Sequence, residues 1–352
     1  MSATTTAVTF ANKCVLHIWG HADEGTPSLV SPSSIALIWY LNSLPRELRD
    51  DFEIVCSNNT DLSMTKELPV LFINSPNGIV TRQRCGFIDI IRYIDTQQQG
   101  HKKTSSSNQQ NLLESALLTY TMTELTLLTD YQLYLNGKNY SNFTNKVFSK
   151  LLYWPMWYNT PLNNRALTRK RYYVHDSPHK ILDTEMEGFE NIHIDEKHEH
   201  DPSMAHSKTF KLTKYKKMQN KKTLQNLQDD MNYNKRFVEV LNDWFEVAKD
   251  VPSIYDGEGS CSSPTYLLLL ANLYIQMELP NGSKIKEYLS SVEHWDKISN
   301  DLEYLKTSGY GEMIIQKDGS IDRNGGLQLQ PAKFNEQGNI ITSLYNYITW
   351  YL

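Results

Sequence analysis

The residues whose types and spacing would suit chemistry are few in this sequence. Ser31 directly precedes Pro32 at the start of an apolar stretch, where a hydroxyl would lie near the N–H groups and the positive dipole of a helix N-terminus. A serine in that position more often caps the helix than acts as a nucleophile, and we favour the cap. The cysteines are too widely spaced for a zinc knuckle or a redox dithiol: Cys14, Cys56, Cys85 and Cys261.

Histidines gather in one polar stretch, at His193, His198, His200 and His206. Their intervals of five, two and six positions match no usual zinc pattern, and they stand among acidic residues with few apolar neighbours. We therefore favour a solvated loop over a metal site. The sequence also lacks the glycine-rich phosphate loops, the zinc-protease motif and the nucleophile elbow. The residues alone predict no catalytic centre, no metal and no cofactor.

Composition narrows the function classes further. The chain has 352 residues and a formal net charge of −5, with a mean hydropathy of −0.50 and a pI near 6.1, which exclude a multi-span membrane protein and disfavour a nucleic-acid binder. The longest apolar run is 12 residues from Tyr266, whereas a spanning helix needs roughly 20. The N-terminus has no signal-peptide or presequence pattern, so we expect reduced cysteines and a cytosolic location.

Residues 14–96 predict a small α/β domain. Short strands are expected at 15–19, 52–55, 68–72 and 78–80, with helices near 31–41 and 87–94. This β-α-β-β-β-α order is of the thioredoxin type, and Pro69 would form its structural proline turn.

A polar linker at 97–110 leads into a region that reads as helical over 111–315. Its expected helices lie at about 111–136, from Tyr140 to a break at Pro155, from about Leu224, and at 264–279. Residues 176–222 are first acidic and then basic, and we interpret them as a mobile insert. Residues 316–331 read as a loop within a C-terminal tail, 316–352. The predicted fold class is α/β plus all-α, a layout that resembles glutathione transferases.

An enzyme of that kind would need a polar pair after the proline turn to hold its peptide-like ligand. The transferases usually place an acidic residue or glutamine there, followed by serine. This sequence has Arg84-Cys85 instead, and Gln83 is one residue out of register. The sequence therefore argues against ligand binding of the transferase type.

Three surfaces are candidates for partner contact. One is an aromatic cluster around Pro155, and a second is the uncharged segment from Gly338 onwards, both suited to a partner or the membrane surface. Their candidate residues are Tyr153, Trp154, Met156, Trp157, Tyr158, Tyr347, Trp350 and Tyr351. The alternatives are core filling for part of the cluster and, for the C-terminal segment, a last helix that packs on the helical domain. The third is basic, with seven lysines in the 15 positions from Lys208 to Lys222. It could attract an acidic partner segment or anionic lipid headgroups, and a plain solvated helix is an equally good interpretation. The candidates are Lys211, Lys214, Lys216 and Lys217.

Longer strings of residues resemble a known family. Residues 17–20 (HIWG), 33–39 (SSIALIW), 57–63 (SNNTDLS) and 68–71 (LPVL) are similar to the N-terminal half of the fungal metaxin-like subunit of the mitochondrial sorting and assembly machinery. Residues 128–136 (LTDYQLYLN) and 148–162 (FSKLLYWPMWYNTPL) resemble its middle. The likeness continues to the C-terminus and covers nearly the whole chain, except residues 1–13, 97–110 and much of 165–206.

The resemblance implies a transferase-like fold without transferase activity, attached peripherally to the cytosolic face of the mitochondrial outer membrane. Its partners would be the barrel-forming core subunit and a second transferase-like subunit of the sorting and assembly machinery (the SAM complex). The chain would support insertion and release of β-barrel precursors, which it would contact transiently. It would also link the complex to the acidic central receptor of the general translocase, the TOM complex. The alternative hypothesis is a cytosolic glutathione-dependent transferase that uses Ser31.

Overall fold

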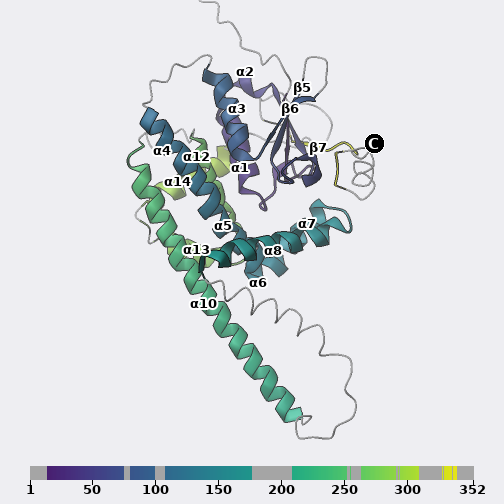
Figure 1. The fold of residues 1–352 in the computed structure, drawn as a ribbon, viewed down its shortest axis with the longest axis vertical. Coiled ribbons are helices and arrows are strands. Elements are labelled where there is room, and N and C mark those ends of the chain that lie inside the picture. The colour runs from purple at the N-terminus through teal and green to yellow at the C-terminus, as the bar shows by residue number, and fades with distance from the viewer. Residues whose placement is uncertain are drawn as a thin grey trace, which may run out of the picture.

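The computed structural model describes residues 14–74, 80–99, 108–176, 208–251, 263–290 and 294–308, together with 254, 292, 327, 329–334 and 336–338. Within them, a mixed β-sheet built mostly from the N-terminal part stands beside a larger group of helices (Figure 1). This arrangement confirms the predicted class, a thioredoxin-like unit followed by a helical region.

The sheet has five strands in the order β6-β5-β1-β4-β7. Strands β1 (Cys14–Ile18) and β4 (Phe52–Cys56) are parallel, β5 (Val70–Asn74) is antiparallel to β1, and β6 (Val80–Cys85) continues the sheet antiparallel to β5. Alternate residues of each strand point to opposite faces, so Leu16 and its register partner Ile54 are both fully buried on one face. The short hairpin of β2 (Gly20–His21) and β3 (Thr26–Pro27) was not predicted.

Helix α1 (Pro32–Ser43) follows the hairpin and is buried from Pro32 to Leu41. It packs against α3 (Phe87–Gln99) on its own domain and against α12 (Pro264–Glu278) of the helical region. A helix that is apolar on all sides is stable only when it is covered on all sides. The remaining local elements are the short helix α2 (Arg46–Arg49) and the single turn η1 (Thr60–Leu62).

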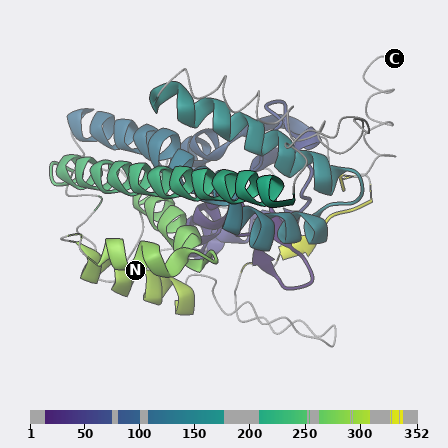
Figure 2. The same cartoon turned by 90° about the horizontal axis from the view of Figure 1, so that it is seen from below.

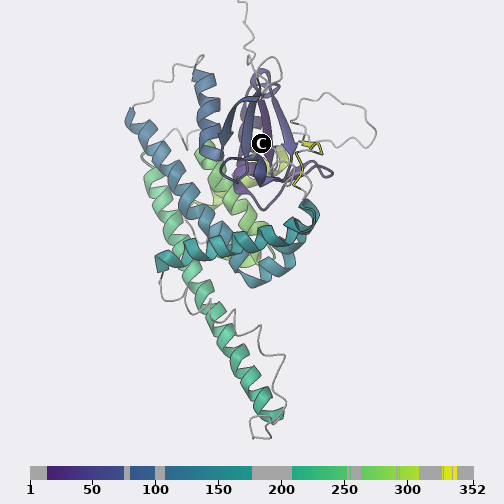
Figure 3. The ribbon, with the colours of Figure 1, turned by 45° about the vertical axis from the view of Figure 1, so that its right-hand side comes forward.

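Strand β7 (Leu329–Pro331) corrects the sequence reading of residues 316–331 as a loop. It pairs in parallel with β4, with Ile54 opposite Leu329 and Cys56 opposite Pro331. Figure 3 places this C-terminal strand beside the strands of the N-terminal domain. Three residues are too few for a period-two pattern, and the proline is tolerated because β7 is an edge strand. The sequence therefore gave no local signal for it.

The helical region begins with one continuous rod from residue 108 to residue 135, close to the expected helix at 111–136. It consists of α4 (Asn108–Tyr120), the π-helical turn η2 (Thr121–Leu125), α5 (Thr126–Asp130) and the π-helical turn η3 (Tyr131–Leu135). The π-turns were not predicted, because the apolar spacing of one widened turn differs little from that of an α-helix. Next come α6 (Gly137–Asn139), the π-turn η4 (Tyr140–Thr144) and α7 (Asn145–Leu151).

Pro155 ends this stretch, as predicted from the sequence. Helix α7 stops at Leu151, and α8 (Met156–Asp176) starts directly after the proline. The Trp154–Pro155 peptide bond is cis, as is Leu68–Pro69 at the expected proline turn.

Helix α10 (Lys208–Ala248) has 41 residues and begins well before Leu224, where the sequence reading placed its start. The lysine-rich half carries little apolar periodicity, so sequence analysis assigned it to the insert instead. In Figures 1 and 3 this half of α10 extends far beyond the other described helices. The helices α12, α13 (Gly282–Leu289) and α14 (Trp295–Ser308) complete the region, and Figure 2 shows the helices gathered around α10.

A network of buried polar side chains joins three helices of this region. Thr129 of α5 donates to Asn272 Oδ1 of α12 at 2.7 Å and accepts from Gln276 Nε2 at 2.8 Å. Tyr233 of α10 donates to Gln276 Oε1. Thr129, Asn272 and Gln276 are fully buried. Removing any one of these side chains would therefore leave a buried polar group of its partner without a hydrogen bond.

We expect the α1–α12 core to control the stability of the chain. Replacing the fully buried Leu269 of α12 with alanine should lower the free energy of unfolding by about 2–5 kcal/mol, because it leaves a cavity in a closely packed region. The matched control is Leu112→Ala on the exposed side of α4, which should change it by less than about 0.5 kcal/mol. Urea unfolding of both variants checks this, and equal losses would contradict it.

Candidate functional site

Ser31 occupies the N-cap of α1. Its Oγ accepts hydrogen bonds from the Ser34 backbone N–H at 3.3 Å and from the Ser34 hydroxyl at 2.9 Å. Only 6% of Ser31 is exposed. The Ser34 hydroxyl in turn accepts the Trp19 N–H at 3.4 Å. The hydroxyl that a transferase would present to its ligand is therefore a structural cap, buried under neighbouring side chains.

The ligand-binding pair of a transferase is missing from the turn after Pro69. Gly86 has a φ of +80° and donates its N–H to the Pro69 carbonyl at 2.9 Å, which fixes the chain between β6 and α3. Arg84 and Cys85 lie at the end of β6, in the place of the transferase ligand pair. Gln83, the one side chain there that resembles a ligand group, donates instead to the Leu62 carbonyl at 2.6 Å.

Cys14 and Cys56 have the properties of buried structural thiols. Burial raises the pKa of the Cys14 thiol, and it raises the pKa of the Cys56 thiol to about 12, so neither forms a thiolate at neutral pH. Within the parts of the chain that the structure describes, no three His, Cys, Asp or Glu side chains come together as a metal site. The candidate histidines of 193–206 lie outside those parts.

A cavity of about 130 Å³ opens between the outer face of the sheet and the segment around β7. Its lining includes His17 from β1, Phe72 from β5, and Lys333 and Glu336 from the C-terminal segment. His17 is 2% exposed, its ring meets Phe72 edge-on at 5.1 Å, and its Nδ1 has no hydrogen-bond partner among the described residues. The sequence holds no local signal for this site, because Lys333 and Glu336 are far from β1 along the chain.

The aromatic corner comprises Tyr153, Trp154, Met156, Trp157 and Tyr158. The Pro155 break turns the chain so that Tyr153, Trp154 and Tyr158 are more than half exposed. Met156 and Trp157 are partly buried and pack on the core. The structure thus brings the five together but divides them into an outer group of three and an inner pair. Tyr347, Trp350 and Tyr351 lie outside the described residues.

The basic candidates all fall on the protruding half of α10. Lys216 and Lys217 are exposed. Lys211 and Lys214 belong to the same helix, although the structure does not describe their side chains. They therefore belong to a helix, whereas the sequence predicts that they lie in a mobile insert.

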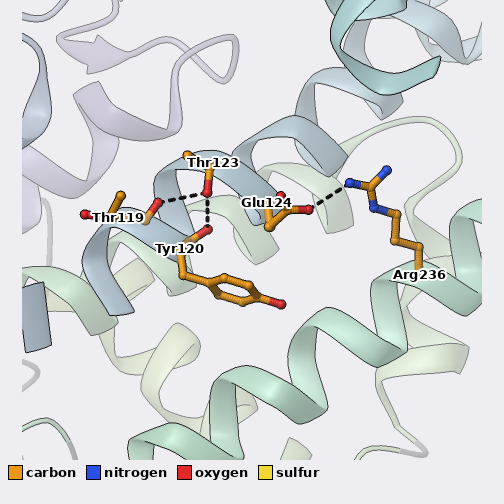
Figure 4. Close-up of polar contacts among 5 residues, drawn as sticks. All are labelled: Thr119, Tyr120, Thr123, Glu124 and Arg236. Atoms are coloured by element: carbon orange, nitrogen blue, oxygen red, sulfur yellow. Dashed lines mark hydrogen bonds and ion pairs between the residues drawn. The ribbon is translucent and has the colours of Figure 1, made fainter. Parts of the chain in front are cut away.

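The other half of α10 is fixed to the body of the helical region. Figure 4 shows Arg236 of α10 reaching Glu124 of η2, with Nη2 and Oε2 2.8 Å apart. Both side chains are mostly buried, and the Arg236 guanidinium also lies 5.4 Å from the centre of the Tyr172 ring of α8. Trp244 Nε1 donates to Thr121 Oγ1 at 2.8 Å. Because the Arg236–Glu124 ion pair is mostly shielded from solvent, it fixes the direction in which the N-terminal half of α10 extends from the helical region.

The fold and the site together define a class: a glutathione-transferase-like chain whose ligand-binding groups are replaced or used for structure. Comparison with known families agrees with that class. Residues 34–165 match the family described as outer mitochondrial membrane transport complex protein, and residues 186–351 match the Tom37 C-terminal domain.

The chain belongs to the Tom37/metaxin family, as the resemblance predicted. Members of this family are components of an outer mitochondrial membrane transport complex and are generally non-catalytic. No curated protein matches this chain. Among the helices that the structure describes, none has both the length and the apolar character needed to cross a bilayer.

Replacing Ser31 with alanine distinguishes a role of Ser31 as a helix cap from a role as a nucleophile. We expect Ser31→Ala to lower the free energy of unfolding by about 1 kcal/mol, because the α1 N-terminus loses its side-chain acceptor. Neither the natural chain nor the variant should be retained on glutathione resin. Retention of the natural chain, lost in Ser31→Ala without a change in urea unfolding, would contradict the cap and support the transferase alternative.

The His17 cavity predicts a specific pH dependence. Burial lowers the pKa of His17 from 6.5 to about 4, with Glu336 opposing and Lys333 assisting the shift. Between these two pH values the unfolded chain binds a proton that the folded chain excludes, so folding stability falls as the pH falls from 6.5 towards 4. The loss from this group is about 3 kcal/mol.

A His17→Gln variant should lack that contribution. Its stability should approach that of the natural chain as the pH is lowered through this window, as measured by urea unfolding at several pH values. Parallel curves for the two proteins would contradict the assignment.

Proposed function

We propose that this chain is a non-catalytic subunit of the SAM complex on the cytosolic face of the mitochondrial outer membrane. There it supports insertion and release of β-barrel precursors and links the complex to the TOM complex. The observation that carries the proposal is that the residues a transferase would use to bind its ligand are replaced or have structural roles in this chain. Ser31 is a buried cap, and the ligand pair is replaced by Arg84-Cys85, so contact surfaces remain as the means of function.

The aromatic corner supports an assignment of subunit contact. Tyr153, Trp154 and Tyr158 offer large rigid side chains that lose little conformational entropy when a partner covers them. Met156 and Trp157 hold this outer group from below by packing on the core. We assign the corner to contact with the barrel-forming core subunit, the second transferase-like subunit or the membrane surface, and we assign Tyr347, Trp350 and Tyr351 to the same role.

The lysines of α10 support an assignment to an acidic partner, for which the TOM central receptor is our candidate. Lys216 and Lys217 are exposed on a helix that leaves the body of the protein, so a partner can approach them without displacing other described elements. Charges of this kind act mainly on the rate and selectivity of association.

A mild-detergent pull-down of the tagged chain from mitochondria, followed by mass spectrometry, tests this function. We expect the barrel-forming subunit and the second transferase-like subunit in near-equal amounts. The combined variant Lys211→Glu, Lys214→Glu, Lys216→Glu and Lys217→Glu should recover less TOM receptor, with the larger loss at low salt. Recovery of the two SAM subunits should not change.

The control is Lys249→Glu, an exposed lysine just beyond the anchored end of α10. Equal recovery of the TOM receptor by the natural chain and the lysine variant at low salt would remove the lysine assignment. Recovery of the chain alone, in the soluble fraction, would overturn the function as a whole.

A further inference from the structure

The outer side of α10 carries three apolar side chains that no described residue covers. Leu224, Leu227 and Met231 are 67%, 52% and 72% exposed. Their i, i+3, i+7 spacing places them in one row along the helix. The buried residues Tyr233 and Phe237 of the same helix face the core. We call Leu224, Leu227 and Met231 the α10 ridge.

The part of α10 that precedes the ridge carries charge of one sign, and Asp229 and Asp230 lie between Leu227 and Met231. From Lys208 to Gln228 the helix contains seven lysines and no aspartate or glutamate, and its first acidic residue is Asp229. No i, i+4 ion pair can therefore form within this half of the helix. Pairs such as Lys214–Lys217 and Lys217–Lys221 instead bring like charges together and destabilise it. An acidic ligand would relieve that repulsion.

We infer that the α10 ridge, together with Lys216 and Lys217, binds an amphipathic helix of a partner protein. The apolar row of that helix packs against Leu224, Leu227 and Met231, and its acidic side chains face Lys216 and Lys217, about two turns away along α10. This is a helix-to-helix mode of recognition, with anchors at i, i+3 and i+7. The inference rests on the proposed function in one respect, that the chain works within a complex.

The ridge fits a protein helix better than a lipid surface. Helices that lie in a bilayer interface bury a broad apolar face with their lysines on the opposite side. Here the apolar row is one side chain wide, and the exposed polar residues Asn220, Gln228 and Asn232 border it. Lys217 lies on the same side as Leu224, two turns away, so a charged side chain follows the apolar row along this side of the helix.

The ridge is also presented in a fixed direction. Arg236, only five residues beyond Met231, pairs with Glu124 in the body of the helical region. Trp244 adds a second hydrogen bond to that body. A partner therefore meets a pre-oriented helix, which reduces the entropy lost on binding.

Site-specific photo-crosslinking in isolated mitochondria tests the inference on the full chain. A p-benzoylphenylalanine probe is placed at position 227, and a control probe is placed at position 167. Leu167 of α8 has nearly the same exposure as Leu227, 53% against 52%, but lies on another helix. We expect the probe at 227 to crosslink to a segment of another protein that has acidic residues and apolar residues at helical spacing, and the probe at 167 not to reach that segment.

Substitutions then distinguish specific contact with the α10 ridge from non-specific association. With the probe kept at 227, Met231→Ser should lower the crosslinking yield by about tenfold, because one of the apolar anchors is lost. The matched control, Leu167→Ser, should leave the yield unchanged. Lys217→Glu should also lower the yield, with a larger loss at low salt than at high salt.

Four results would overturn the inference: crosslinks confined to residues 177–207 of the same chain, to a second copy of the chain, to lipid, or absent altogether. A fifth would be an unchanged yield in both Met231→Ser and Lys217→Glu. In each case, recovery of the barrel-forming subunit in the same preparation separates the two failures. If that subunit is present, only the ridge assignment fails, and if it is absent, the proposed function fails as well.

Discussion

The contact between α1 and α12 is the constraint on which the rest of the structure depends. Both helices are buried along most of their length, so neither is stable unless every side is covered. The sheet and α3 cover one side of α1, and α12 covers another, with Trp39 and Tyr274 in ring contact at 5.8 Å. Burial of these two helices joins the thioredoxin-like unit to the helical region as one core.

This constraint also affects the place where a transferase would bind its ligand. The N-terminus of α1 is drawn into the same core, and its unpaired N–H groups must be satisfied there without water. Ser31 satisfies one of them, and the Ser34 hydroxyl links Ser31 to the Trp19 backbone. A hydroxyl used in this way is not presented to a ligand. The loss of ligand chemistry is therefore a consequence of how tightly this end of the helix is packed.

The two halves of α10 divide structural and contact roles within one helix. Its C-terminal half is held by the Arg236–Glu124 ion pair, by Trp244 and by the buried network of Tyr233 and Gln276. Its N-terminal half bears only lysines among its charged residues and projects from the body. The anchored C-terminal half sets the position of the projecting N-terminal half. In the same way, Met156 and Trp157 position the exposed aromatic side chains beside them.

Most of the fold could be predicted from the sequence. The element order of the N-terminal domain, the break at Pro155 and the α12 helix follow from local patterns of apolar residues, prolines and turns, and all three are present. The replacement of the ligand pair by Arg84-Cys85 is also a matter of sequence. The start of α10 at Lys208 was missed, because a helix without apolar periodicity has no signal except its lysines and their helix propensity.

What the sequence determined by itself is the set of properties that short windows encode: which segments must be buried on all sides, where helices break, and where charges of one sign accumulate. Only the tertiary structure decided that β7 returns to β4, that His17 is enclosed beside Glu336, and that Trp154 is exposed while Trp157 is partly buried. The same holds for the ridge, since only the structure shows that Leu224 and Leu227 are exposed. The physical reason is that burial depends on contacts between segments far apart in the chain, and no local pattern specifies which face of a helix those segments will cover.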